Sequence, residues 1–172
     1  MDRTDILRQL ISFPTISANP NGELIAYCAD LLQSAGAQVV MIKDPVQPKA
    51  NLYATIGPDD RAGVMLSGHT DVVPVAGQDW TVPPFEMTEK DSKVFGRGTT
   101  DMKGFVACAL SAALRAASMD LKTPLHLALS YDEEIGCIGV QSMIDMLAKA
   151  PFRPKFCIVG EPTGMKVATG HK

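Results

Sequence analysis

One stretch of the chain, residues 66–74, reads Leu66-Ser67-Gly68-His69-Thr70-Asp71-Val72-Val73-Pro74. An apolar run precedes it, and this pattern predicts a buried strand over residues 64–67 that leads into a polar tip. Side chains at positions i and i+2 of an extended segment point the same way, so one nitrogen of His69 can face a ligand while Asp71 holds the other. By itself the pair fits equally a polar strand end that meets water.

Composition restricts the classes of protein to consider. The chain has 172 residues, of which 46% are hydrophobic and 20% charged, as expected for one globular domain with its own core. A net charge of −3 does not indicate the basic surface with which proteins bind nucleic acid. The longest apolar run, residues 104–114, is too short to span a membrane. Residues 1–5 are polar and do not resemble a secretory signal, which predicts a cytoplasmic protein.

The four cysteines support the same compartment. They form no C-x-x-C pair and have apolar neighbours in the sequence, so we expect small core residues in a reducing cytoplasm.

Hydrophobic periodicity predicts helices that alternate with strands. Helices are expected over residues 5–11, 23–35, 102–117 and 139–148. Strands are expected over residues 39–42, 51–56, 64–67, 125–130, 156–159 and 167–169, with one more that ends at Phe95. A long loop over residues 72–89 is predicted either to be ordered near a site or merely to be pinned to the surface. This alternation predicts a three-layer α/β/α sandwich with a mostly parallel mixed sheet.

Acidic residues follow several of the predicted strands. Glu133 and Glu134 follow one strand, Glu161 follows another, and Asp101 lies between a strand and a helix. Each has a simpler interpretation, because Asp101 could cap its helix and the glutamates could form solvated turns. Sites in parallel sheets form outside the carboxyl ends of the strands, however, so we expect all of these residues to converge with His69.

One imidazole with several carboxylates and no thiolate is a ligand set that suits zinc, cobalt or manganese. The set has too many acids for one zinc ion, which favours two metals bridged by a carboxylate. One carboxylate would remain to act as a base. His126 lies inside a predicted strand and is interpreted as a structural histidine rather than a ligand.

Four motifs resemble those of the co-catalytic zinc amidohydrolases of the aminoacylase and carboxypeptidase type, and the resemblance extends over the whole chain. They are residues 67–74, residues 98–104 (Gly98-Thr99-Thr100-Asp101-Met102-Lys103-Gly104), Asp132-Glu133-Glu134 and Val159-Gly160-Glu161-Pro162-Thr163. The resemblance implies a di-zinc peptidase-like catalytic domain, with cobalt as a possible substitute for zinc.

The resemblance also implies a role for each residue. Its metal ligands would be His69, Asp101, Glu134 and Glu161. His69 and Glu161 would bind the first metal, Glu134 the second, and Asp101 would bridge them and precede a cis peptide. The catalytic residues would be Glu133 as general base and Asp71 as the partner that orients His69.

Members of this family are about twice as long as this chain. Residues 1–172 are therefore expected to be the N-terminal portion of the catalytic domain, without the lid domain and the C-terminal catalytic segment. The resemblance implies that the lid forms a homodimer and that the later segment supplies a further histidine, which neither His126 nor His171 matches. The portion alone is expected to have little or no activity.

The expected substrate is a small N-acyl amino acid. The ending Gly170-His171-Lys172 favours the deacetylases of the family over the desuccinylases, which usually have an arginine pair there. A related metallopeptidase and a non-catalytic metal-binding homologue or fragment remain as alternatives. Retention of Glu133 favours an enzyme over the non-catalytic alternative.

Overall fold

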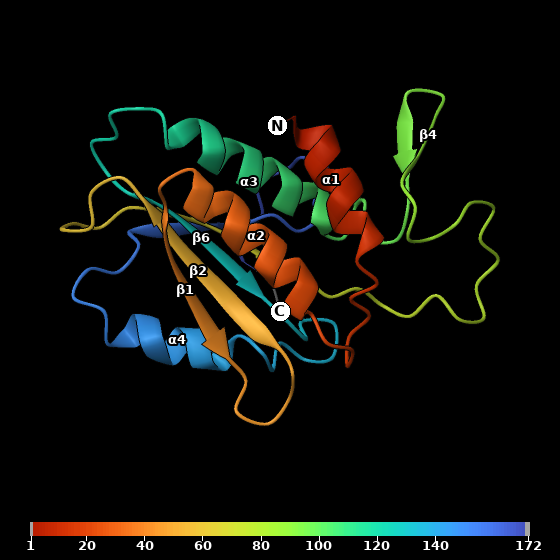
Figure 1. The fold of residues 1–172 in the computed structure, drawn as a ribbon, viewed down its shortest axis with the longest axis horizontal. Coiled ribbons are helices and arrows are strands. Elements are labelled where there is room, and N and C mark those ends of the chain that lie inside the picture. Colours follow the sequence, from red (N-terminus) through yellow and green to blue (C-terminus); the bar gives the residue numbers. More distant parts are fainter. Residues whose placement is uncertain (1, 171–172) are drawn as a thin grey trace.

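The computed structural model describes residues 2–170 and consists of a sheet with helices packed against it (Figure 1). The helices are α1 (Arg3–Ser12), α2 (Gly22–Ser34), α3 (Lys103–Ala116) and α4 (Gln141–Ala148). The strands are β1 (Gln38–Lys43), β2 (Ala50–Ile56), β3 (Val64–His69), β4 (Thr88–Lys90), β5 (Lys93–Phe95), β6 (Leu125–Ser130) and β7 (Phe156–Val159). These elements agree with the predicted ones, apart from β4, which the sequence did not predict because residues up to 89 were expected to form a loop, and the strand expected over residues 167–169.

The main sheet has the strand order β1-β2-β6-β3-β7. Strand β3 lies between β6 and β7 and runs parallel to both, whereas β2 is antiparallel to β1 and to β6. Strands β4 and β5 form a separate hairpin. The prediction of a mostly parallel mixed sheet is therefore confirmed. The parallel pairing of β3 with β6 and β7 places the carboxyl ends of these three strands side by side.

Helices cover both faces of this sheet. Helices α1, α2 and α3 share one apolar core with β2 and β6, while Met143 of α4 packs against Tyr53 and Ala128 in a second cluster. Figure 1 shows α4 apart from the other three helices. The three-layer arrangement predicted from the sequence is therefore present.

Contacts between α1 and α3 fix the start of α3, which follows Asp101 in the sequence. Helix α1 buries the stripe Ile6, Leu7, Leu10 and Ile11 and ends before Pro14, because a residue that precedes proline disfavours helical backbone. Lys103, at the start of α3, is fully buried and donates from Nζ to the carbonyl oxygens of Leu10 (3.0 Å) and Phe13 (2.7 Å). Burial lowers the pKa of Lys103 to about 7.

Two predictions about local structure are wrong. Within the described residues, 167–169 form no strand, and Val167 is 91% exposed, because its β-prone sequence finds no strand to pair with. Of the four cysteines only Cys28 is buried, while Cys108, Cys137 and Cys157 are exposed. Apolar neighbours in the sequence therefore do not predict the side of an element on which a cysteine lies.

Two other sequence interpretations can be compared with the structure. His126 has a structural environment, since its Nδ1 lies 3.0 Å from Thr55 Oγ1 and its ring stacks on Tyr53. The long loop is ordered by contacts, because the Arg97 guanidinium stacks on the Trp80 ring at 5.0 Å. Among residues 2–170, no helix combines the length and the apolar character needed to cross a membrane.

Candidate metal centre

His69 is the last residue of β3 and is buried. Its Nδ1 lies 2.9 Å from the backbone oxygen of Asp71 and 3.5 Å from Asp71 Oδ1. The sequence predicted that the Asp71 carboxylate would hold this nitrogen, and the structure adds the backbone carbonyl as the nearer partner. With Nδ1 engaged in this way, Nε2 is left to face the acidic residues.

The carboxylates predicted from the sequence surround His69 Nε2. Asp101 Oδ1 lies at 3.0 Å, Glu161 Oε1 at 3.7 Å and Glu133 Oε2 at 3.8 Å from this nitrogen. Potential ligand atoms within 4.8 Å of one another fall into two groups. They are His69 with Glu133 and Glu161, and His69 with Asp101 and Glu134. Three strand ends and the turn before α3 therefore converge, as the parallel arrangement of β3, β6 and β7 requires.

The electrostatics of the cluster favour a cation. Burial lowers the pKa of His69, but the hydrogen bond and charge of Asp71 and the charge of Glu161 outweigh it and raise this pKa to about 9. Burial and the charge of Asp101 raise the pKa of Glu134, and burial also raises the pKa of Glu161. One imidazole thus faces four carboxylates, a ligand set that fits divalent zinc or cobalt.

Asp71 contacts His69 and also anchors the acidic loop, which is the segment of residues 131–138 that follows β6. Its Oδ2 accepts hydrogen bonds from Ser17 Oγ at 2.6 Å and from the Glu134 backbone N–H at 3.3 Å, while Oδ1 accepts from the Glu133 N–H at 3.1 Å. Burial raises the pKa of Asp71, but the hydrogen bonds from His69, Ser17 and the Glu133 backbone outweigh it and lower this pKa below its usual range. One carboxylate therefore sets the backbone position of two predicted site residues.

Asp101 is placed by the turn that opens α3. The Asp101–Met102 peptide is cis, as the resemblance implied. The side chain of Asp101 points to His69 instead of capping the helix, whose N-cap residue is Met102. Gly104 is required in this turn, because a Cβ there would lie 2.2 Å from the Thr99 carbonyl oxygen. The alternative of Asp101 as a helix cap is therefore not what the structure shows.

Sequence reasoning missed an ion pair directly beside the site. It treated Asp132 as one of three adjacent acids, but Asp132 turns away from the cluster and pairs with Lys49 at 2.7 Å and 2.6 Å. It also missed Ser17, which binds Asp71 across 54 positions of sequence. Lys49 and Ser17 both lie in loops, and no pattern in the sequence around them indicates either contact.

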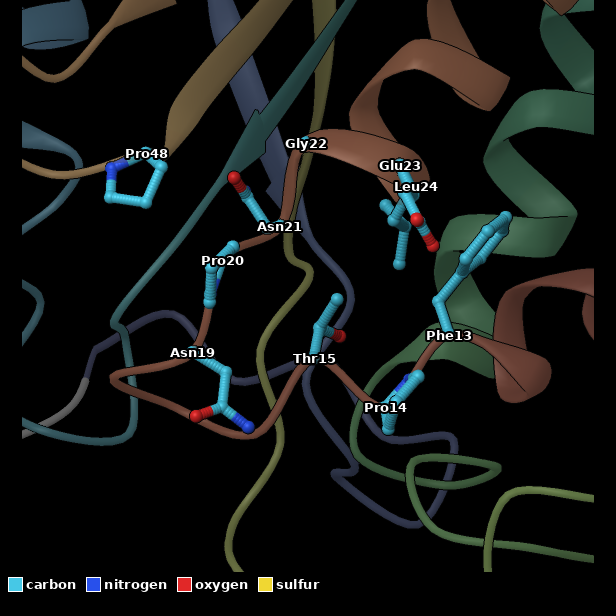
Figure 2. Close-up of a pocket in the computed structure, with 10 residues that line it drawn as sticks. All are labelled: Phe13, Pro14, Thr15, Asn19, Pro20, Asn21, Gly22, Glu23, Leu24 and Pro48. Carbon is cyan, nitrogen blue, oxygen red and sulfur yellow. The ribbon is translucent and has the colours of Figure 1, made fainter.

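A separate pocket of about 430 Å³ lies beside the connection between α1 and α2 (Figure 2). None of the predicted site residues lines this pocket, which is lined by residues 13–15, residues 19–24 and Pro48. The same connection carries Ser17, which holds Asp71. The pocket therefore borders the support of the metal centre rather than its carboxylates.

The amino-acid sequence of the chain is similar to those of known proteins. The chain matches the sequence profile of Peptidase family M20/M25/M40 over residues 65–171. It is 37% identical to the acetylornithine deacetylases of Proteus mirabilis (strain HI4320) and Shigella sonnei (strain Ss046), over 98% of this chain. The chain covers 44% and 45% of those relatives, so it spans less than half of their length.

Solved structures show the same fold. Human carnosine dipeptidase 1 superimposes with a TM-score of 0.79 at 26% identity, over 91% of this chain and 37% of that protein. An M20 family metallo-carboxypeptidase from Sulfolobus solfataricus also has a TM-score of 0.79, at 23% identity, over 93% of this chain and 37% of its own. The sheet and helices described above are therefore those of a metallopeptidase catalytic domain.

Proposed function

The chain belongs to peptidase family M20/M25/M40, and from this premise we propose that it forms the metal-binding part of an acetylornithine deacetylase. The reaction is hydrolysis of the acetyl amide of N-acetylornithine to ornithine and acetate, a step of arginine biosynthesis. The identity to two acetylornithine deacetylases supports this substrate. The observation that carries the proposal is the convergence of an imidazole and four carboxylates at the carboxyl ends of parallel strands.

The proposal concerns the full-length protein, of which residues 1–172 would be the N-terminal portion of the catalytic domain. A lid domain and a second catalytic segment would follow, and the lid would make the enzyme a homodimer. The portion alone would turn over little substrate, because the later segment completes the metal site. We also place the protein in the cytoplasm, since its four cysteines are free thiols.

Two zinc ions fit the site, with cobalt as a substitute. His69 and Glu161 would hold the first, Glu134 the second, and Asp101 both. When bound, such ions polarise a carbonyl group and lower the pKa of a water molecule. The imidazole and carboxylate ligands are of the kinds that zinc prefers, and the raised pKa values of Glu134 and Glu161 fall when a cation is present.

Glu133 is the residue that would move the proton. Its Oε2 lies 3.8 Å from His69 Nε2 and its side chain is 37% exposed, so it borders the centre while remaining open to water. Its backbone N–H is fixed by Asp71. Glu133 takes a proton from the attacking water and returns it to the nitrogen of the leaving amine. Both transfers use one carboxylate in one position, so its placement governs the rate.

The test is Glu133→Gln in the full-length protein. We expect metal content to stay unchanged and kcat for N-acetylornithine to fall by about 10²- to 10⁴-fold, the usual contribution of general acid–base catalysis. Glu86→Gln, at an exposed glutamate, is the matched control and should keep full activity. Normal turnover by Glu133→Gln would contradict the proposed role.

Two related activities compete with this assignment. The similarity to human carnosine dipeptidase 1 makes a dipeptidase the second candidate. A succinyl-diaminopimelate desuccinylase is the third, and the ending that argues against it, His171-Lys172, lies outside the described residues. Parallel assays with N-acetylornithine, N-succinyl-diaminopimelate and a dipeptide separate the three, and we expect the highest kcat/KM for N-acetylornithine.

A further inference from the structure

Asp132, the residue before Glu133, has an unusual backbone. It is 2% exposed and has a φ of +54°, a left-handed conformation that few residues other than glycine adopt. Its backbone oxygen accepts the Ile138 N–H at 3.2 Å, which closes the acidic loop on itself. The backbone conformation of Asp132 therefore sets the direction of the chain between β6 and Glu133, and this conformation needs contacts that stabilise it.

The side chain of Asp132 is held by Lys49. Nζ of Lys49 lies 2.7 Å from Oδ1 and 2.6 Å from Oδ2 of Asp132, and the two side chains are 1% and 2% exposed. The Ala18 N–H adds a third bond to Oδ1 at 3.3 Å. Because a buried carboxylate without a partner is strongly disfavoured, Asp132 cannot turn away from Lys49 without a large cost in stability.

Lys49 itself is fixed by the hairpin loop between β1 and β2. Its backbone oxygen accepts the Asp44 N–H at 2.9 Å, and the Asp44 carboxylate accepts the Tyr131 hydroxyl at 2.6 Å. Asn51, just beyond Lys49, donates to the Gly139 carbonyl at 2.7 Å. The hairpin thus binds the chain on both sides of Glu133, at Tyr131 and at Gly139.

The contacts of Asp132 affect the backbone of the two residues that follow it, Glu133 and Glu134. The N–H groups of Glu133 and Glu134 both point to Asp71, at 3.1 Å and 3.3 Å. This paired arrangement requires the turn that Asp132 makes. We infer that Lys49 is a positioning residue of the active site, which holds Asp132 so that the carboxylates of Glu133 and Glu134 meet His69. The inference rests on the proposed role of Glu133 and adds a residue from a distant loop.

The test compares Lys49→Met with the double variant Lys49→Met/Asp132→Asn in the full-length protein. Asparagine tolerates the left-handed backbone and removes the unpaired buried charge. We expect kcat to fall by about 10- to 100-fold in both variants, as for a misplaced catalytic group, with KM changed by less than about threefold. The melting temperature should fall in the single variant and recover in the double variant. Lys43→Met, at an exposed lysine of the same hairpin, is the matched control.

A second readout does not depend on turnover. The visible absorption spectrum of the Co²⁺-loaded protein reports ligand geometry, and it should change in both variants but not in Lys43→Met. Unchanged kcat and spectrum in Lys49→Met would overturn the inference. So would a double variant that regains kcat together with its melting temperature, because the pair would then be structural. If Lys49→Met does not fold, the double variant alone decides between these results.

The two proposals fail in different ways. Normal turnover by Glu133→Gln would remove the proposed role of Glu133 as general base, yet the cobalt spectrum of the Lys49 variants would still report whether Lys49 sets the position of the ligands. An inactive Glu133→Gln beside a fully active Lys49→Met would overturn the role of Lys49 alone.

Discussion

Replacing Asp71 with asparagine should loosen the acidic loop, and the size of the effect follows from the hydrogen bonds. Both oxygens of Asp71 accept: Oδ1 binds the Glu133 N–H, and Oδ2 binds the Glu134 N–H and the Ser17 hydroxyl. Asparagine has the same shape but offers one oxygen and one NH₂ group. Whichever way the amide is turned, one part-buried backbone N–H faces the N–H of the asparagine amide.

The magnitude combines two terms. A buried donor left without an acceptor costs about 1–3 kcal/mol, and loss of the negative charge weakens the surviving bond by about 1 kcal/mol. The hydroxyl of Ser17 can rotate to accept a bond from the NH₂ group, so it adds no penalty. The free energy of local opening of the acidic loop should therefore fall by about 2–4 kcal/mol in Asp71→Asn.

Hydrogen exchange measured by mass spectrometry on the metal-free, full-length protein tests this value. Amides of the peptide that contains Glu133 and Glu134 should exchange at least about 30-fold faster in Asp71→Asn, the factor that 2 kcal/mol produces. Asp60→Asn is the control, because Asp60 is exposed and pairs with its neighbour Arg61. An acceleration below about threefold would refute the reasoning, since the two N–H groups would then not depend on Asp71.

Two further predictions concern stability. Gly139→Ala would place a Cβ 2.1 Å from the Tyr131 carbonyl oxygen and should lower the free energy of unfolding by about 1–3 kcal/mol in urea titrations. In the control Gly22→Ala the new Cβ meets nothing within 4 Å, so the free energy of unfolding should change by less than about 0.5 kcal/mol. Burial lowers the pKa of His126, so the unfolded chain takes up a proton below pH 6.5 that the folded chain resists, and stability falls as the pH drops. His126→Phe, which keeps the stacking on Tyr53, should weaken this dependence below about pH 6.5, and an unchanged slope would contradict it.

The sequence predicted most of the fold because the core is periodic. The apolar stripe of α1 and the nearly continuous apolar run of β6 have the spacings that helices and central strands require. The convergence of the candidate ligands could be predicted for a related reason, since His69 ends a strand, Glu133 and Glu161 each follow one, and these parallel strands end at the same edge of the sheet. Both predictions depend on patterns that are local in the sequence.

The sequence did not predict contacts between residues that are far apart along the chain, because local patterns do not encode them. Lys49 and Asp132 are 83 positions apart, and lysine is so rarely buried that its sequence context favours the surface. The strand expected at Val167 failed because β-propensity describes how a residue fits a sheet and needs a neighbouring strand to take effect. The exposed cysteines show the same limitation, because apolar neighbours along the chain say little about the neighbours across it.

The order of strands in the sheet has a consequence for how the protein is made. Strands β1 and β2 are adjacent in sequence and in space, so they can pair as soon as both have left the ribosome. Strand β3 pairs with β6 and β7, and β7 follows His69 by roughly 90 residues, which take about 5–20 s to synthesise at typical rates. Both edges of β3 lack their final partners until β6 has been made, and one edge lacks its partner until β7 has been made. A strand with an open edge invites pairing with another nascent chain. Synthesis therefore exposes β3, the strand that ends in His69, to aggregation before its neighbouring strands exist, and the three strand ends of the candidate metal centre can come together only after β7 has been translated.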